Sequence, residues 1–329
     1  MQDKVILGVD ISKKKFDVCL LINKKERYKV FQNTRAGFEQ CLSWCKGHDA
    51  NVLWFCLEAT SWYGEELAEY MSQLGHMVSV INPSRIKAYA QSKGLRQKTD
   101  KADSRVIADF CRVQQPLIWI PPSKEERYLR DLCRALETLK ESQRSLANRL
   151  ENTRIHDDVR NSLTTVIDAY DQEIKNIGKM IKDKVNQSVD LKRRVELLTQ
   201  IKGIGFLTAI TLLVEIPNVS NFENAREYVA FAGLNPRQHS SGSSVRGKQR
   251  ISKIGSQRVR KALFMPALVV KNKNHYFKGF CDRLTTKGKC AKVIIVAVMR
   301  KLMHIVFGML KNNTSFDHKL AFSGDASNN

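Results

Sequence analysis

The chain has 329 residues, of which 43% are hydrophobic, and a formal net charge of +22 at pH 7. This length predicts two or three domains, and the hydrophobic share excludes wholesale disorder. The positive charge predicts a polyanionic partner, with nucleic acid ahead of an anionic membrane surface and of acidic small substrates.

The apolar segments are short. We find no apolar run near the roughly 20 residues that span a bilayer, and Val293–Met299 reads as a buried helix. The run at 5–9 is too short for a signal peptide. The 8 cysteines form no C-x-x-C pair and the 7 histidines no H-x-x-x-H pair, which indicates reduced core thiols more than disulfides or zinc ligands. We therefore expect a soluble intracellular protein without a membrane partner.

The first 121 residues alternate strand and helix patterns. Short apolar or alternating runs predict strands at 5–10, 16–22, 27–32, 52–57 and 77–81. Apolar residues at helical spacing predict helices at 35–46, 65–74, 83–90 and 100–113. Three strands followed by helix–strand units favour a mixed α/β sheet.

Beyond Pro121-Pro122 the pattern becomes helical. Leucines at a/d spacing begin at Leu129, and a second apolar stretch covers 159–181 after a polar bend at 154–158. This predicts a coiled coil or a helical hairpin, which would serve equally as a spacer or as a dimerisation arm. From Leu191 the pattern stays helical, apart from a Ser/Gly-rich loop at 239–247. We divide the chain into 1–121 (α/β), 122–190 (helical, coiled coil) and 191–329 (mainly helical).

Four acidic residues occupy related places in the predicted sheet domain. Asp10 ends the first strand, Glu58 ends the fourth, and Asp100 and Asp103 share one face at the start of a helix. If the first and fourth strands are neighbours, the four carboxylates converge, and a divalent cation such as Mg²⁺ would offset their repulsion. Taken singly, Asp100 and Asp103 fit helix capping, and the other two fit turn or loop positions.

A basic run surrounds a cluster of serines. Residues 240–261 contain no acid, and their cations are Arg246, Lys248, Arg250, Lys253, Arg258, Arg260 and Lys261. Such a run would neutralise phosphates, although solvated basic faces are also common. The loop holds Ser240, Ser241, Ser243 and Ser244 but no G-x-S-x-G motif, so a Ser-His-Asp hydrolase is unsupported and composition alone favours a flexible loop.

The segment 197–209 has the glycine spacing of a helix-hairpin-helix element. Lys202, Gly203 and Gly205 would present backbone N–H groups to a phosphate at a helix start. A glycine turn between two core helices explains the same residues equally well. Contacts of this kind position DNA and do not read its sequence.

Two sets of motifs resemble one protein family. Gly8-Val9-Asp10-Ile11-Ser12, Phe16-Asp17, Glu58-Ala59-Thr60 and Lys98-Thr99-Asp100-Lys101-Ala102-Asp103 resemble the RuvC-like domain of the DEDD transposases of the one-ten insertion-sequence family. Gly233-Leu234-Asn235-Pro236-Arg237, Ser241-Gly242, Val245-Arg246-Gly247 and Ile251-Ser252-Lys253-Ile254-Gly255 resemble its C-terminal transposase domain.

The resemblance implies a ribonuclease H-like fold in which Asp10, Glu58, Asp100 and Asp103 bind Mg²⁺. It also implies a bridge RNA that pairs with target and donor DNA. The serine before the glycine is the family's nucleophile, which points to Ser241, with Ser240 one residue away. This serine would form a transient phosphoserine link and complete a composite site beside the metal.

From these features we expect a recombinase of an insertion sequence in the bacterial cytoplasm, associated with the nucleoid. Arg237, Arg246 and Arg250 are candidates to stabilise developing charge. Joining strands at two sites requires a homo-oligomer, such as a dimer or a tetramer. Two alternatives remain: a structure-specific endonuclease such as a junction resolvase that uses only the acidic site, and a non-catalytic RNA-binding scaffold.

Overall fold

A computed structural model describes residues 5–23, 25–59, 62–95, 99–216, 218–237, 240–241, 245–246 and 250–319. For residues 237, 240, 241, 245, 246 and 250 it describes the backbone alone. The chain divides into two compact units, Met1–Pro121 and Pro122–Asn329. We describe each unit separately.

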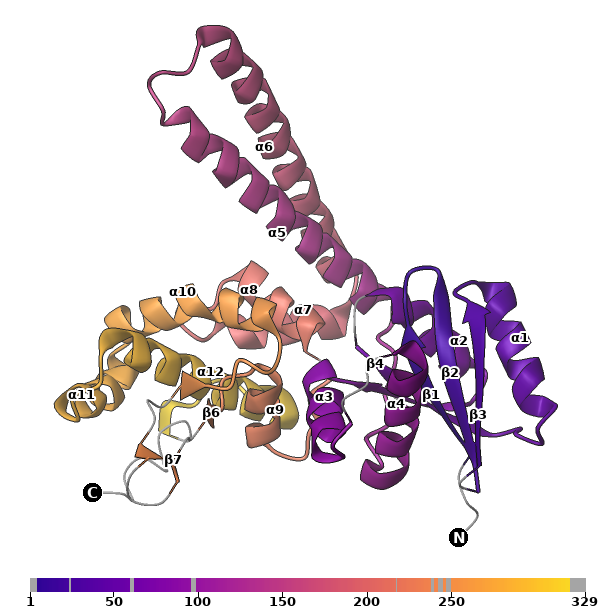
Figure 1. Cartoon of the computed structure of the whole chain (residues 1–329). Helices are drawn as coiled ribbons and strands as arrows, with labels where there is room; N and C mark the ends of the chain where they lie inside the picture. The colour runs from indigo at the N-terminus through magenta and orange to yellow at the C-terminus, as the bar shows by residue number, and fades with distance from the viewer. Residues whose placement is uncertain are drawn as a thin grey trace. The chain divides into compact units, whose positions relative to one another are not determined.

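The first unit is built from strands and helices in alternation (Figure 1). Its strands are β1 (Val5–Ile11), β2 (Lys15–Ile22), β3 (Lys25–Gln32), β4 (Leu53–Glu58) and β5 (Met77–Ile81). Its helices are α1 (Arg35–Lys46), the short η1 (Trp62–Gly64), α2 (Glu65–Gln73), α3 (Pro83–Ser92) and α4 (Asp100–Gln114). Each predicted strand and helix of this unit is present, with ends that differ by no more than two residues.

The five strands form one mixed sheet in the order β3-β2-β1-β4-β5. β1 pairs with β2 and β2 with β3 in antiparallel fashion, whereas β1 with β4 and β4 with β5 are parallel. This confirms the predicted mixed α/β sheet, and it meets the condition that we set for convergence of the carboxylates, because the first and fourth strands are neighbours. The carboxyl ends of β1 and β4 therefore lie side by side.

Successive side chains of a strand point to opposite faces of the sheet, and apolar residues occur on both faces. Helices cover each face. One face packs against α1 and α2 through residues such as Phe38, Leu67 and Met71. The other face packs against α3 and α4 through residues such as Ile86 and Ile107. Glycine at position 8 belongs to this second face, because side chains two apart on a strand point the same way.

The second unit is mainly helical. Its longer helices are α5 (Lys124–Leu150), α6 (Asp157–Asn186), α7 (Val189–Thr199), α8 (Phe206–Glu215), α9 (Ala225–Phe231), α10 (Gln257–Lys273), α11 (Lys278–Thr286) and α12 (Ala291–Asn312). Two short helices are η2 (Val219–Asn221) and η3 (His275–Phe277). Four two-residue strands are β6 (Pro236–Arg237), β7 (Ser240–Ser241), β8 (Val245–Arg246) and β9 (Arg250–Ile251).

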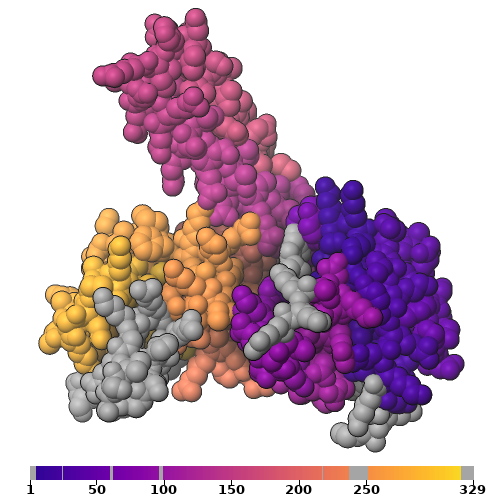
Figure 2. Space-filling model, in the orientation of Figure 1, coloured from indigo at the N-terminus to yellow at the C-terminus, as the bar shows by residue number. Residues whose placement is uncertain are grey.

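Helices α5 and α6 lie side by side as the expected helical hairpin, and they extend away from the other helices of their unit (Figure 1). A capping box at Ser123 and Glu126 begins α5. Only the base of the hairpin is buried, at Leu129, Leu132 and Leu136 of α5 and at Ile181 and Val185 of α6. On the face shown in Figure 2 its outer part stands clear of the rest of the unit.

Helix α12 forms the centre of the second unit. It is 22 residues long and, by length and composition, apolar enough to cross a membrane, which corrects our expectation that no segment approaches that length. Nine of its side chains are buried in the same cluster as residues of α7, α8 and α10, and 56% of its apolar window is buried within the protein. The 8 cysteines all fall within the described ranges as free thiols; six are buried, as expected for core thiols, whereas Cys133 is half-buried and Cys290 is exposed.

Candidate active site

Three strands bring carboxylates to one edge of the sheet. Val9 of β1 pairs with Leu57 of β4, so Asp10 and Glu58 occupy the next position along these neighbouring strands. Asp10 of β1 pairs directly with Asp17 of β2 across the antiparallel ladder. Because neighbours across a ladder point to the same face, the three carboxylates share the face that α3 and α4 cover.

Helix α4 brings the remaining two carboxylates to this edge. Its path lies so close to β1 that a Cβ added to Gly8 would be 2.2 Å from the Ser104 carbonyl oxygen. The N-cap of α4 is Thr99, whose hydroxyl accepts a hydrogen bond from the Ala102 N–H at 3.2 Å. Thr99 therefore performs the capping that we considered for Asp100. Asp100 and Asp103 stand in the first turn, where a carboxylate is favourable beside the helix N-terminus.

The charges of this group act on Asp10. Partial burial raises the pKa of its carboxyl from 3.8 to about 6, and the charges of Asp103, Asp100, Glu58 and Asp17, in that order, add to the effect. Glu58, Asp100 and Asp103 therefore lie within electrostatic reach of the fourth predicted acid, Asp10, as does Asp17, which we did not predict as a site residue. The part of this effect that comes from the neighbouring carboxylates is a negative potential, and a negative potential also attracts a cation.

Lysine 15 is the second residue that sequence reasoning missed. Its Nζ lies 2.8 Å from Oδ2 of Asp100 and 3.1 Å from Oδ2 of Asp17. The Tyr28 hydroxyl donates a hydrogen bond to the other oxygen of Asp17. The sequence did contain a signal for Asp17. The turn between the first two strands is short, and the antiparallel register that follows from it places Asp17 opposite Asp10.

The donor set suits a hard divalent ion, because all of its ligand atoms are carboxylate oxygens. Within the residues that the structure describes, no group of three or more His, Cys, Asp or Glu side chains is arranged to hold a metal ion. The carboxylates converge on Asp10 without meeting at one ligand position. They match a hard divalent cation in ligand type, and such a cation would offset their mutual repulsion.

The predicted serine nucleophile lies in the second unit, in a pair of small ladders. β7 pairs with β8, with Ser240 opposite Arg246 and Ser241 opposite Val245, and β6 pairs with β9, with Arg237 opposite Arg250. The structure describes only the backbone of Ser241 and of Arg237, Arg246 and Arg250. Lys248, with Lys98, Gly242, Ser243, Ser244 and Gly247, lies outside the described residues.

Main-chain contacts anchor the two ends of this loop. The Ser252 N–H donates to the Asn235 carbonyl at 2.9 Å, and the Ser256 N–H donates to the Phe231 carbonyl at 3.0 Å. Gly255 has a φ of 144°, and a Cβ there would be 2.2 Å from the Phe231 carbonyl oxygen. Ser256 then caps α10, so the base of the loop is continuous with a core helix.

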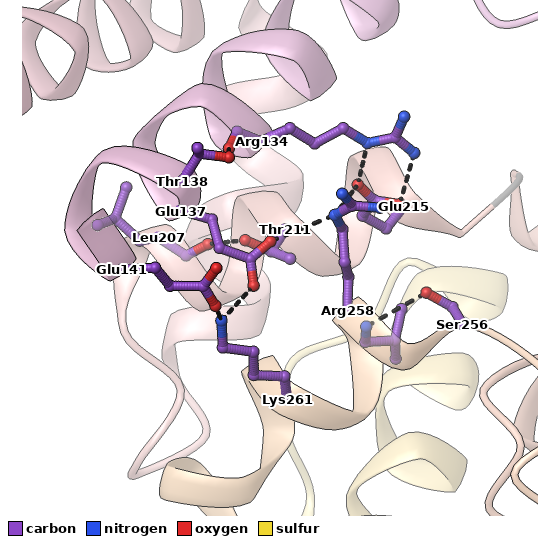
Figure 3. Close-up of polar contacts among 11 residues, drawn as sticks. Arg134, Glu137, Thr138, Glu141, Leu207, Thr211, Glu215, Ser256, Arg258 and Lys261 are labelled. Carbon is purple, nitrogen blue, oxygen red and sulfur yellow. Dashed lines mark hydrogen bonds and ion pairs between the residues drawn. The ribbon is translucent and has the colours of Figure 1, made fainter. Parts of the chain in front are cut away.

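Three cations of the predicted nucleic-acid-binding run have partners within the protein, namely Arg258, Arg260 and Lys261. Arg260 donates to the carbonyl oxygens of Ala232 and Gly255, both at 3.0 Å, and its burial lowers the pKa of the guanidinium. Lys261 pairs with Glu137 at 2.7 Å and with Glu141 (Figure 3). Their contact with nucleic acid, like that of Lys253, stays a prediction.

Figure 3 shows how Arg258 and Arg134 share Glu215, the last residue of α8. Arg134 binds both oxygens of Glu215, at 2.7 and 3.0 Å, and Glu215 is 6% exposed. Arg258 lies 3.2 Å from Glu137 and 4.0 Å from Glu215. These ion pairs join α5 and α8 to the helix that follows the serine loop.

The glycine turn between α7 and α8 has the packing expected of a turn between two core helices. Gly203 has a φ of 107°, and a Cβ there would lie 3.0 Å from the Pro266 carbonyl of α10, so this glycine is required for packing. Gly205 is the N-cap of α8 without a side-chain cap bond, and space is open around it. Lys202 is exposed beside it. Phosphate binding by Lys202, Gly203 and Gly205 stays a prediction.

Comparison with known proteins identifies the family. Residues 7–153 match a family model of IS110-type DEDD transposases, and residues 195–282 match the model described as transposase IS116/IS110/IS902 family. A pilin gene-inverting protein of Moraxella bovis is 35% identical over 96% of this chain and 99% of its own. A transposase for insertion sequence element IS1111A of Coxiella burnetii is 24% identical over 96% of this chain and 92% of its own. The chain belongs to the IS116/IS110/IS902 family of transposases.

Proposed function

We propose that this transposase is a site-specific DNA recombinase of an insertion sequence, with an acidic site and a serine nucleophile. The observation that carries the proposal is the convergence of Glu58, Asp100 and Asp103 on Asp10, together with family membership over both units. The fold of the first unit is RuvC-like, and Asp10, Glu58, Asp100 and Asp103 would hold Mg²⁺. A divalent ion bound there would supply charge stabilisation for the attacking and leaving oxygens.

In the proposed reaction, the Ser241 hydroxyl oxygen attacks a scissile phosphorus. A serine–phosphate ester forms as the bond from phosphorus to the sugar oxygen breaks, and the sugar leaves as a hydroxyl that takes up the proton. The number of phosphoester bonds is conserved. The hydroxyl of another DNA strand can therefore attack the serine–phosphate ester, release the serine and rejoin DNA without an external energy source. Arg237, Arg246 and Arg250 would stabilise the developing charge on the phosphate oxygens.

The proposed partners are target and donor DNA, a bridge RNA that pairs with both, and further copies of the chain as a dimer or tetramer. Base pairing would supply specificity, while the surface of net charge +22 binds backbone. In the assembled complex, Ser241 and the four acidic residues would together form one composite site. The place of action is the cytoplasm, on the nucleoid.

Inversion is a second outcome of the same chemistry. The Moraxella bovis relative is named as a pilin gene-inverting protein, whereas the Coxiella burnetii relative is named as a transposase. Inversion and transposition both cut and rejoin strands at two sites, and they differ in how the sites are arranged. We propose that site placement decides between them for this chain.

The test is reconstitution with RNA transcribed from the flanking non-coding end of the element, candidate DNA sites and Mg²⁺. Denaturing gels should show a protein–DNA adduct for the wild type, none for Ser241→Ala, and an undiminished one for Ser240→Ala. Asp10→Asn should lose both adduct and product. Cleavage that survives in Ser241→Ala would refute the serine mechanism in favour of a resolvase. Wild-type binding without any cleavage would favour a scaffold.

A further inference from the structure

A lysine occupies the acidic edge of the sheet. Lys15 bridges Asp17, whose side chain is 4% exposed, and Asp100, whose side chain is 58% exposed. The two ends of this bridge differ in freedom, because a buried carboxylate has far fewer accessible orientations than an exposed one. Lys15 is therefore held by Asp17, and Asp100 is the partner that can leave.

The surrounding contacts fix Lys15 on this edge. The main-chain N–H and the hydroxyl of Ser12 both donate to the Lys15 carbonyl, at 2.9 and 2.8 Å. The Asn33 amide donates to the Ser12 carbonyl at 3.1 Å, which ties the turn to the neighbouring strand. Tyr28 holds Asp17 from the other side. The position of the ammonium thus follows from the backbone of the hairpin and from a buried acid.

Asp100 cannot bind the Lys15 ammonium and a divalent ion through the same oxygen without bringing two positive charges close together. Its Oδ2 accepts the hydrogen bond from Lys15, and a metal bound at the same oxygen would stand a few ångströms from a positive charge. Two like charges at such a distance repel each other unless solvent or a further anion screens them. Asp17 lies 3.1 Å from the same ammonium, so Lys15 would still have a partner beside the site, and this repulsion would accompany metal binding.

We propose that Lys15 is a built-in competitor for Asp100, so that a divalent metal enters the acidic site only by displacing the Lys15 ammonium from that carboxylate. The inference rests on the proposed metal-binding role of the acidic residues. It adds a device that weakens metal binding and keeps Asp100 bound to the ammonium until a metal displaces it. Asp17 and Tyr28 are positioning residues that keep the ammonium near the site.

The test measures Mn²⁺ binding to the full-length chain by the electron paramagnetic resonance signal of free Mn²⁺, without nucleic acid. Lys15→Met should bind Mn²⁺ about three- to fivefold more tightly than wild type, since an exposed ion pair is weak. Lys15→Arg, which retains the pair, should bind like wild type. Lys14→Met removes the same charge from an exposed lysine of the same turn and measures the general electrostatic contribution.

Each outcome decides between the parts of the proposal. Lys15→Met binding no tighter than Lys14→Met, or weaker than wild type, would overturn the competitor role. If Lys15→Met folds poorly because Asp17 loses its partner, the double variant Lys15→Met/Asp17→Asn should still bind Mn²⁺ more tightly than Asp17→Asn alone. Failure of the proposed metal site looks different, because Asp10→Asn would then bind Mn²⁺ as the wild type does.

Discussion

Replacing Asp10 with asparagine should stabilise the first unit when chelator removes divalent metal. A pKa raised from 3.8 to about 6 means that the folded state binds the proton more tightly than the unfolded state does. At pH 7.5 the carboxylate is charged in both states, and the charge destabilises the fold. A shift of this size corresponds to about 3 kcal/mol. Because Asp10 is only half-buried, solvent screening reduces the expected gain to about 1–2 kcal/mol.

The sign of this effect gives it a pH signature. The gain from Asp10→Asn should be fully present above about pH 6 and should shrink as pH falls through about 6, because protonated Asp10 then resembles asparagine. Below the unfolded pKa of 3.8, it should disappear. Tight Mg²⁺ binding by the wild type should also reduce the gain, since ligand binding stabilises the folded form.

The assay is urea unfolding followed by tryptophan fluorescence. The 4 tryptophans, Trp44, Trp54, Trp62 and Trp119, all fall in the first unit, so the signal reports its unfolding alone. Glu39→Gln makes the same charge change at an exposed position of α1 and should leave stability within about 0.5 kcal/mol of wild type. A destabilised Asp10→Asn, or a gain that persists unchanged at about pH 4, would refute the electrostatic reasoning.

Two further substitutions test the packing around the sites. Gly8→Ala places a Cβ 2.2 Å from the Ser104 carbonyl oxygen, so we expect a loss of about 2–3 kcal/mol in urea unfolding and weaker Mn²⁺ binding, whereas Gly47→Ala, with 3.5 Å of space, should be nearly neutral. Glu215→Gln removes the buried carboxylate charge that pairs with the guanidinium of Arg134 and should destabilise the second unit by about 2 kcal/mol, measured by circular dichroism. Arg134→Met in the same chain should recover part of that loss, and no recovery would show that the pair is not the cause.

Local patterns in the sequence were sufficient for most of the first unit. Alternation and helical spacing are properties of short segments, so the strand 77–81 and the helix 35–46 were predicted at the bounds observed. The identity of the four acids also followed from their places at strand ends and at a helix start. The hairpin of α5 and α6 followed from sustained apolar spacing, although only its base is buried.

Tertiary structure decided which charged groups meet. The pairing of Lys15 with Asp100, 85 positions away, depends on how closely α4 approaches the sheet, which the missing side chain of Gly8 permits. In the same way, Lys261 meets Glu137 on a helix 124 positions earlier. The sequence alone determined that these residues are charged and which local elements carry them. Their partners depend on contacts between distant segments, because Coulomb energy depends on separation in space and not on separation along the chain.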